Sequence, residues 1–148
     1  MSIEIGKAEP GSLNEVIALL ARVNLPADGV AQHFSHFLVA REANHLVGCV
    51  GLEVYGDAAL LRSLAVAPEY QKTGLGKRLT EGALDLARAQ GVRDVVLLTL
   101  TAADFFRHSF EFAPVERAAY HEVFADSAEW RLPCCSPAVC LHLKIENE

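Results

Sequence analysis

The stretch that decides the fold is "LLRSLAVAPEYQKTGLG", residues 60–76. Its apolar first half is typical of a buried strand that ends before Pro68. The residues after it, "KRLTEGALDLARAQG", have the spacing of an amphipathic helix. Gly74 and Gly76 therefore fall at a strand-to-helix turn. Backbone amides at a helix N-terminus lack intrahelical partners and lie at the positive end of the helix dipole, so such a turn can bind an anion.

The two glycines can be compared with known phosphate-binding turns. Glycine at 74 and 76 lets the backbone approach a phosphate without a Cβ in the way, and the simpler alternative is that both only close a tight turn. A Walker loop requires G-x-x-x-x-G-K-S/T. A dinucleotide-binding turn requires G-x-G-x-x-G after the first strand, whereas Leu79 stands at the third glycine position here. The sequence therefore excludes both of these motifs.

Apolar spacing predicts the elements on either side of this turn. Strands are expected at 3–8, 36–43, 45–55, 58–66, 94–101 and 138–145, and helices at 13–23 (capped by Ser12 or Asn14), 28–34, 75–90 and 103–108. The three strands between 36 and 66 form an antiparallel meander, and strand 94–101 is apolar enough to be central. Strands first, followed by alternating helix and strand, predict an α/β fold with a mixed sheet and helices on both faces.

Composition limits the class of protein. A chain of 148 residues has the size of one domain, so we expect residues 1–148 to form a single domain. The net charge of −6 and the lack of a basic patch argue against nucleic acid as a partner. Because no apolar run is long enough to span a membrane and no signal-peptide pattern is present, we expect no membrane partner and a cytoplasmic protein.

The stretch from Leu60 to Phe106 resembles the core of the GNAT acyl-CoA N-acetyltransferases. The signature of that family is R/Q-x-x-G-x-G/A after a strand of the form L-x-V-x-P, and Gln71, Gly74 and Gly76 fill it. The resemblance implies the GNAT fold, with a mixed but mostly antiparallel sheet of six to seven strands. It also implies acetyl-CoA as cosubstrate and no metal.

The same resemblance implies which residues bind the cosubstrate. Backbone amides of residues 72–77 would cradle the pyrophosphate, and strand segment 64–66 would pair with the pantetheine arm. This strand and the strand 94–101 would splay apart to make room for the thioester. The residues implied to bind acetyl-CoA are Leu64, Ala65, Val66, Gln71, Lys72, Thr73, Gly74, Leu75, Gly76, Lys77, Phe105 and Phe106.

Several shorter segments resemble one branch of the family. These are "LLRSLAV", "VVLLTLTAADFF", "APVER" and "PCCSPAVCL". They are similar to the small N-acetyltransferases that resemble the acetyltransferase domain of N-acetylglutamate synthase and are often labelled arsenic-resistance N-acetyltransferases. The resemblance implies a small amine or amino-acid acceptor. The family often dimerises through C-terminal strands, so a homodimer is favoured.

The group that protonates the leaving thiolate is not evident. The family often uses a tyrosine in a "YEKLGF" segment, and the corresponding segment here is "FFRHSFEF", residues 105–112, with Ser109 or Glu111 at the usual glycine place. The tyrosine place then holds Phe105, Phe106 or Arg107, none of which is an acid at neutral pH. Either the thiolate leaves unaided, or solvent or a side chain such as His108 protonates it, or the chain is a CoA-binding regulatory module with weak catalysis.

Charged residues in the apolar strands are candidates for the acceptor site. Glu53 could act as general base, or it could point outward to solvent. Arg62 is a lone arginine in an apolar strand, so it could bind a substrate carboxylate or form an ion pair with an internal Asp or Glu. Asn24 and Leu25 could close the acceptor pocket, as that loop often does in the family, or only end the helix.

The cysteine-rich tail suggests a different function. Cys134, Cys135 and Cys140 could bind trivalent arsenic, or they could pack as small apolar groups, as reduced thiols like Cys49 do. The reading favoured by the whole sequence is an N-acetyltransferase that transfers acetyl from acetyl-CoA to the amino group of a small amino-acid-like acceptor by direct attack. The alternative is a CoA-binding regulatory module or pseudoenzyme.

Overall fold

The computed structural model describes residues 2–132 and 138–146. They form a seven-stranded sheet with the order β1-β2-β3-β4-β5-β7-β6. Its strands are β1 (Ile3–Lys7), β2 (Phe37–Glu42), β3 (His45–Tyr55), β4 (Ala58–Val66), β5 (Asp94–Thr99), β6 (Ala113–Pro114) and β7 (Val139–Lys144). Neighbouring strands pair antiparallel except β4 and β5, which pair parallel. The predicted mixed, mostly antiparallel sheet is therefore confirmed.

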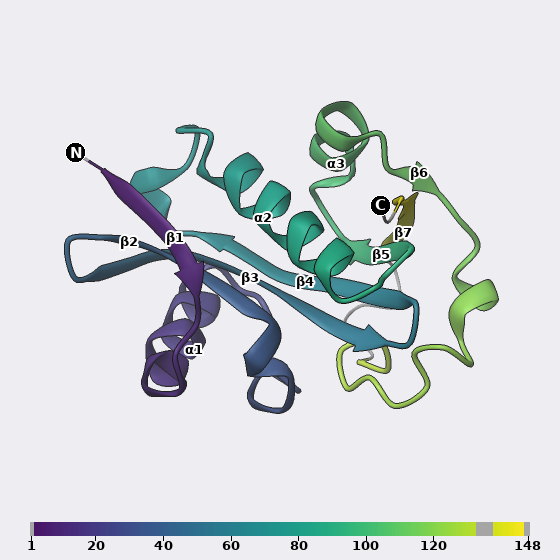
Figure 1. The fold of residues 1–148 in the computed structure, drawn as a ribbon. Helices are drawn as coiled ribbons and strands as arrows, with labels where there is room; N and C mark the ends of the chain where they lie inside the picture. Colours follow the sequence, from purple (N-terminus) through teal and green to yellow (C-terminus); the bar gives the residue numbers. More distant parts are fainter. Residues whose placement is uncertain (1, 133–137, 147–148) are drawn as a thin grey trace.

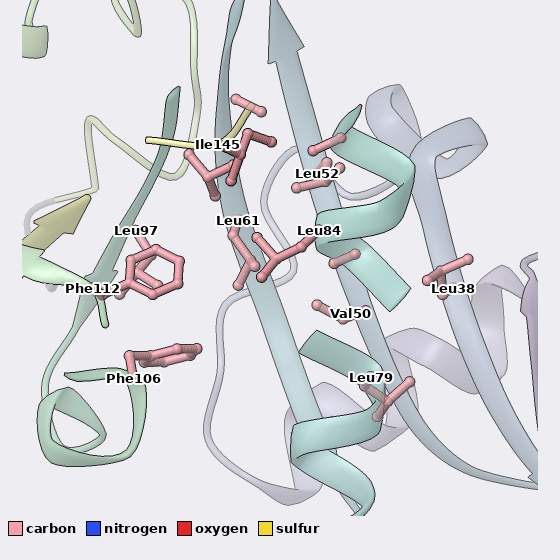
Figure 2. Close-up of a cluster of buried hydrophobic side chains, with 14 of the residues drawn as sticks. Leu38, Val50, Leu52, Leu61, Leu79, Leu84, Leu97, Phe106, Phe112 and Ile145 are labelled. Carbon is pink, nitrogen blue, oxygen red and sulfur yellow. The ribbon is translucent and has the colours of Figure 1, made fainter. Parts of the chain in front are cut away.

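Helices cover both faces of the sheet (Figure 1). The helices are α1 (Leu13–Arg22), α2 (Leu75–Ala89) and α3 (Ala103–Phe110), with short 3-10 turns at Pro10–Ser12, Ala31–His36, Pro68–Tyr70 and Arg117–Tyr120. Leu79 and Leu84 of α2 belong to the same buried cluster as Val50, Leu52 and Leu61 of the sheet (Figure 2). The opposite face is covered by α1, by the turn Ala31–His36 and by the segment 115–132. None of the described helices is long and apolar enough to cross a membrane.

Three local details differ from the sequence-based expectations. Ser12 precedes α1, but its hydroxyl makes no capping bond and accepts instead from Arg41 Nη2 at 2.7 Å. The expected helix over 28–34 is a 3-10 turn, Ala31–His36. The short strand β6 was not predicted, because its two residues include Pro114, which cannot donate a ladder hydrogen bond.

The sheet opens in its middle. Pairing of β4 with β5 ends at Leu61 and Leu97, and among the described residues no pairing joins the two strands beyond that point. The register of β3 and β4 shifts between Cys49 and Gly51. Ser63, on the longer side of this bulge, has a φ of +59°. The bulge lies directly after the last β4 residue that pairs with β5, and bulges increase local twist. The expected splay is confirmed.

Candidate functional site

A cleft of about 250 Å³ lies where β4 ends and α2 begins. The residues that line it are Val66, Tyr70, Gln71, Lys72, Gly74, Gly76, Lys77 and Phe105. All except Tyr70 were expected to contact the cosubstrate. Tyr70 had no recognisable signal, because it belongs to the short turn Pro68–Tyr70 rather than to the glycine motif.

Side-chain bonds hold the turn in front of α2. Gln71 Nε2 donates to the Val66 carbonyl at 3.1 Å, and Thr73 Oγ1 donates to the Tyr70 carbonyl at 2.5 Å. Gly74 has a left-handed φ of +86° and immediately precedes Leu75, the first residue of the helix. A residue with a Cβ would be strained at that φ, so Gly74 is needed to bring the chain into the helix. The first amides of α2 thus lie beside the cleft.

Gly76 serves a different purpose from Gly74. It lies inside α2, where its conformation requires no glycine. A Cβ built on it would lie 3.9 Å from both Phe105 Cζ and Val66 Cγ2, two atoms of the cleft wall. The backbone of Gly76 is therefore open toward the cleft. A phosphate in the cleft could therefore reach the backbone amide of Gly76 without meeting a Cβ. A tight turn alone would not require glycine at this helical position.

The remaining residues of the expected cosubstrate site lie behind this surface. The side chains of Ala65, Leu75 and Phe106 are buried in the apolar core, so only their backbones could meet a ligand. Leu64 is half-buried and packs against the same core. Thr73 uses its hydroxyl to hold the turn, as described above.

Helix α3 settles the register of the "FFRHSFEF" segment. It ends at Phe110, and Glu111 follows with a left-handed φ of +63°, the conformation that favours glycine. Glu111 therefore takes the glycine place, and the exposed Arg107 takes the tyrosine place. His108 is exposed and lines a broad groove with Arg88 and Lys144 rather than the cleft.

A buried polar cluster lies on the face of the sheet opposite α2. We use this name for His33, Glu53, Tyr55, Arg62, Ser63 and Glu129. Arg62 Nη1 donates to Glu53 Oε2 at 2.7 Å, and both side chains are fully enclosed. Arg62 Nε also donates to Ser63 Oγ at 2.9 Å. Glu53 points inward, so the alternative prediction that it faces solvent is wrong. Arg62 forms an ion pair with an internal Glu, which was one of the two predictions for this residue.

Glu53 has two further partners. Tyr55 donates its hydroxyl to Glu53 Oε1 at 2.6 Å, and His33 Nε2 lies 3.5 Å from the same oxygen. Burial, followed by this hydrogen bond to Glu53, raises the pKa of Tyr55. Burial lowers the pKa of His33, although the Glu53 carboxylate opposes this effect. Tyr55 therefore stays protonated, and His33 is neutral at pH 7.

Glu129 belongs to this cluster and was not predicted from the sequence. Its Oε1 lies 3.6 Å from Arg62 Nε, and its side chain is 10% exposed. Burial raises the pKa of Glu129 to about 7; Arg62 acts against this rise, and Glu53 adds to it. The surrounding segment is poor in regular spacing, so no periodicity could have placed this carboxylate beside Arg62.

The loop after α1 covers Arg62. Asn24 is exposed and has a left-handed φ of +61°, which ends the helix, and Leu25 packs against the apolar residues beneath α1. The Pro26 carbonyl accepts from Arg62 Nη2 at 3.3 Å. A Cβ on Gly29 would come within 3.2 Å of Arg62 Nη1. The loop thus lies over the buried polar cluster. Its contacts with Arg62 come from Pro26 and Gly29 and not from the predicted residues Asn24 and Leu25.

The described cysteines are buried free thiols. Burial raises the pKa of Cys49 to about 12 and that of Cys140 to about 11. Cys134 and Cys135 lie outside the described residues. Within the ranges 2–132 and 138–146, no group of three or more His, Cys, Asp or Glu side chains is arranged to hold a metal ion.

Comparisons with known proteins assign the family. Residues 14–112 match the model of the "Acetyltransferase (GNAT) family", and the chain belongs to this family. An uncharacterised N-acetyltransferase of Chlorobaculum tepidum is 32% identical over 85 residues, which are 57% of this chain and 55% of that protein. The amino-acid acetyltransferase of Pseudomonas fluorescens is 36% identical over 89 residues, 58% of this chain and 21% of that protein. The chain therefore spans between about a fifth and just over half of these relatives.

Solved structures agree with the fold. N-acetylglutamate synthase from Neisseria gonorrhoeae, complexed with coenzyme A and N-acetyl-glutamate, superimposes with a TM-score of 0.81 at 19% identity. The match covers 99% of this chain and 36% of that one. Acetyl-CoA is the cosubstrate that fits this family.

Proposed function

We propose that this chain transfers acetyl from acetyl-CoA to the amino group of a small amino-acid-like acceptor by direct attack. The observation that carries the proposal is the position of two features on β4. The glycine-lined cleft lies at the end of this strand, and the buried polar cluster lies where β4 and β5 diverge. If the pyrophosphate of acetyl-CoA binds at the start of α2 and the pantetheine arm follows β4, the thioester would reach the buried polar cluster.

The cosubstrate would be held mainly by backbone. The amides of residues 72–77 would receive the pyrophosphate, with Lys72 and Lys77 on the cleft wall supplying positive charge. Segment 64–66 of β4 lies past the last residue paired with β5 and could pair with the amide groups of the arm. Acetyl-CoA supplies the activated acyl group, and the protein's part is to orient it and keep water away.

Arg62 would recognise the acceptor's carboxylate. A guanidinium has five donors, and the bonds to Glu53, Ser63 and Pro26 use three of them. A carboxylate could therefore still bind. Because the side chain is fully enclosed, the loop segment 26–29 that covers it must move to admit an acceptor.

The exposed Arg107 at the tyrosine place leaves thiolate departure to solvent or to the low basicity of the coenzyme thiolate itself. Glu53 is fully occupied by Arg62, Tyr55 and His33, so its part as a base would require one of these partners to be released. We therefore assign it to holding Arg62 in place.

The first experiment measures free-CoA release from acetyl-CoA with a panel of amino acids, simple amines and amino-acid analogues, including those that contain arsenic or phosphorus, beside a CoA titration. Turnover with carboxylate-bearing acceptors is expected. Tight CoA binding with no turnover across the panel would favour a regulatory module instead.

Arg62→Lys then tests the acceptor site. It keeps the charge opposite Glu53 but loses the planar fork, so we expect the KM for the acceptor to rise at least about tenfold while the Kd for CoA stays unchanged. Arg22→Lys is the matched control, because Arg22 pairs with Glu69 on the surface. An unchanged acceptor KM in Arg62→Lys would limit Arg62 to a structural ion pair.

A further inference from the structure

The buried polar cluster holds more carboxylates than cations. Arg62 is its single guanidinium, and two carboxyl groups, those of Glu53 and Glu129, lie against it. Glu53 receives short bonds from Arg62 and Tyr55 and lies near His33. Glu129 is only within 3.6 Å of Arg62 Nε, a distance too long for a hydrogen bond. One carboxylate is therefore satisfied, and the other still has capacity to accept.

The backbone that carries Glu129 is well held. Trp130 N donates to Ser127 Oγ at 3.1 Å, which closes the turn around Glu129. Arg117 Nη2 donates to the Trp130 carbonyl at 2.5 Å, and its guanidinium lies 4.9 Å from the centre of the Trp130 ring. The Trp130 ring in turn packs on Phe124. The backbone on either side of Glu129 is thus held by these contacts of Ser127 and Trp130.

Glu129 also lies close to the place where acetyl transfer would occur. Arg62 follows Leu61, the last β4 residue that pairs with β5, and it precedes the bulge residue Ser63. The Arg62 Nε atom faces both Ser63 Oγ at 2.9 Å and Glu129 Oε1 at 3.6 Å. The carboxylate is slightly exposed, so a proton that it receives can pass to solvent.

We propose that Glu129 receives the ammonium group of the acceptor and takes its proton, and that Arg62 and Glu129 together recognise an α-amino acid as a zwitterion. This inference rests on the proposed function. The adjacent guanidinium and carboxylate present opposite charges side by side. An α-amino acid does the same, because one carbon separates its carboxylate from its ammonium group. Acceptors whose two charges are farther apart cannot meet both partners at once.

The step balances as follows. The acceptor ammonium gives one proton to Glu129, and the resulting neutral amine attacks the thioester carbonyl. A C–N bond forms, the C–S bond breaks, and the electron pair of that bond leaves with the sulfur. The second nitrogen proton is lost as the amide forms and protonates the thiolate directly or through water. Protonated Glu129 then releases its proton to solvent.

The electrostatic surroundings suit this role. Burial raises the pKa of Glu129 to about 7, Arg62 opposes the rise and Glu53 reinforces it. His33 and Tyr55, which lie against Glu53, are neutral at pH 7, so they add no fixed charge. A carboxylate that titrates near neutrality can accept a proton and give it up again within each turnover.

Glu129→Gln tests the inference, with turnover by the wild-type protein as the first requirement. We expect kcat/KM for an α-amino acid at pH 7 to fall by about 10²–10⁴-fold, as for loss of a general base. The pH dependence should change as well. Wild-type kcat/KM should rise through the pKa of Glu129 and level off, whereas the variant should keep rising toward alkaline pH, because its acceptor must arrive already neutral. Glu129→Asp should keep the wild-type shape at a lower rate.

The controls separate the two proposals. Glu122→Gln removes an exposed carboxylate from the same segment and should leave kinetics unchanged. CoA affinity and melting temperature verify that each variant is folded. Wild-type protein should acetylate 2-aminobutyrate much faster than 4-aminobutyrate or butylamine. A wild type that acetylates nothing overturns the proposed function. An active wild type with an unchanged rate and pH profile in Glu129→Gln overturns this inference alone, as does equal use of 2- and 4-aminobutyrate.

Discussion

At the scale of single residues, the feature that matters most is the ion pair between Arg62 and Glu53. Both side chains are fully enclosed, and their nitrogen and oxygen atoms lie 2.7 Å apart. A buried pair of this kind contributes little compared with apolar side chains of the same volume, but it is costly to break, because the surviving charge has no water around it. The pair therefore couples the acceptor site to the stability of the sheet.

We predict that Arg62→Ala lowers the free energy of unfolding by about 3–5 kcal/mol, because it leaves Glu53 buried without its countercharge. The double variant Arg62→Met/Glu53→Leu removes both charges and should therefore be destabilised much less than Arg62→Ala. Urea unfolding of the single and double variants measures both effects. Equal destabilisation by the double variant and Arg62→Ala would show that packing, and not the unpaired charge, causes the loss.

Glu129 makes stability depend on pH in a predictable direction. Its pKa is about 7 in the folded protein and near 4.5 when unfolded, so the folded state binds the proton more tightly. This contribution to stability is fully present below the unfolded pKa and is lost as the pH rises through 7. Glu129→Gln, which mimics the protonated form, should therefore be more stable than the wild type at pH 8, by up to about 3 kcal/mol.

Thermal melts at pH 5 and pH 8 check this expectation. The difference between the variant and the wild type should be small at the lower pH and large at the higher pH. Glu122→Gln should melt like the wild type at both. A difference that does not change with pH would mean that Glu129 keeps an ordinary pKa in the folded protein.

At the scale of elements, the turn between β4 and α2 combines two glycines with different tasks. Gly74 is required by its φ of +86°, whereas Gly76 has a helical conformation and leaves room beside Phe105 and Val66. The motif could be found in the sequence because strand, turn and helix follow one another directly. Local spacing was enough to predict the turn, and the family resemblance implied most of the residues of the cleft wall.

Opposite effects on stability are expected when either glycine is changed to alanine. Gly74→Ala should destabilise the protein by about 1–2 kcal/mol because alanine is strained at that φ. Gly76→Ala should stabilise α2 by about 0.5–1 kcal/mol through higher helix propensity. Gly76→Leu should fill the cleft and abolish CoA binding while the protein remains folded. Chemical unfolding and CoA titration provide both readouts, and normal CoA affinity in Gly76→Leu would contradict the assigned cleft.

The placement of segment 115–132 could not be predicted from the sequence. Its placement depends on contacts of Tyr120, Phe124 and Trp130 with Leu60 and Val96 of the sheet, which are distant along the chain. The only helix in this segment, which the structure describes throughout, is the short 3-10 turn Arg117–Tyr120, so no long regular element signals the packing of these aromatic residues. Arg62 and Glu53 were identified because a charge is conspicuous in an apolar strand. Glu129 was missed because only long-range packing brings it to them.

At the scale of the whole molecule, two parts of the sheet are joined by a short seam. β1 to β4 form one part, and β5, β7 and β6 form the other. The seam consists of the pairs from Ala58 with Asp94 to Leu61 with Leu97. Beyond it the two strands no longer pair, and this unpaired part of β4 carries Arg62 and Ser63 of the buried polar cluster and ends at Val66 of the cleft.

Hydrogen exchange should report this seam. We predict that, in the free protein, peptides covering residues 62–66 exchange faster than those covering 58–61, because β5 no longer pairs with β4 there. CoA should slow exchange in 62–66 and 72–77 and leave 3–7 unchanged. Mass spectrometry with and without CoA measures each region. Protection by CoA confined to the residues 84–89 and 143–146 would place the ligand in the broad groove instead.

The opening between β4 and β5 also gives the sheet an edge in its interior. The outer edges are guarded in familiar ways: β1 is short and carries Glu4 and Lys7, and β6 has only two residues, one of them Pro114. The interior edge carries a bulge at Ser63 and the inward-pointing Arg62, but its backbone groups that lack a β5 partner could still pair with a foreign chain. A bound pantetheine arm would pair with this edge reversibly and shield it. Cells short of acetyl-CoA would then hold a protein that sticks more readily to itself and to extended peptides.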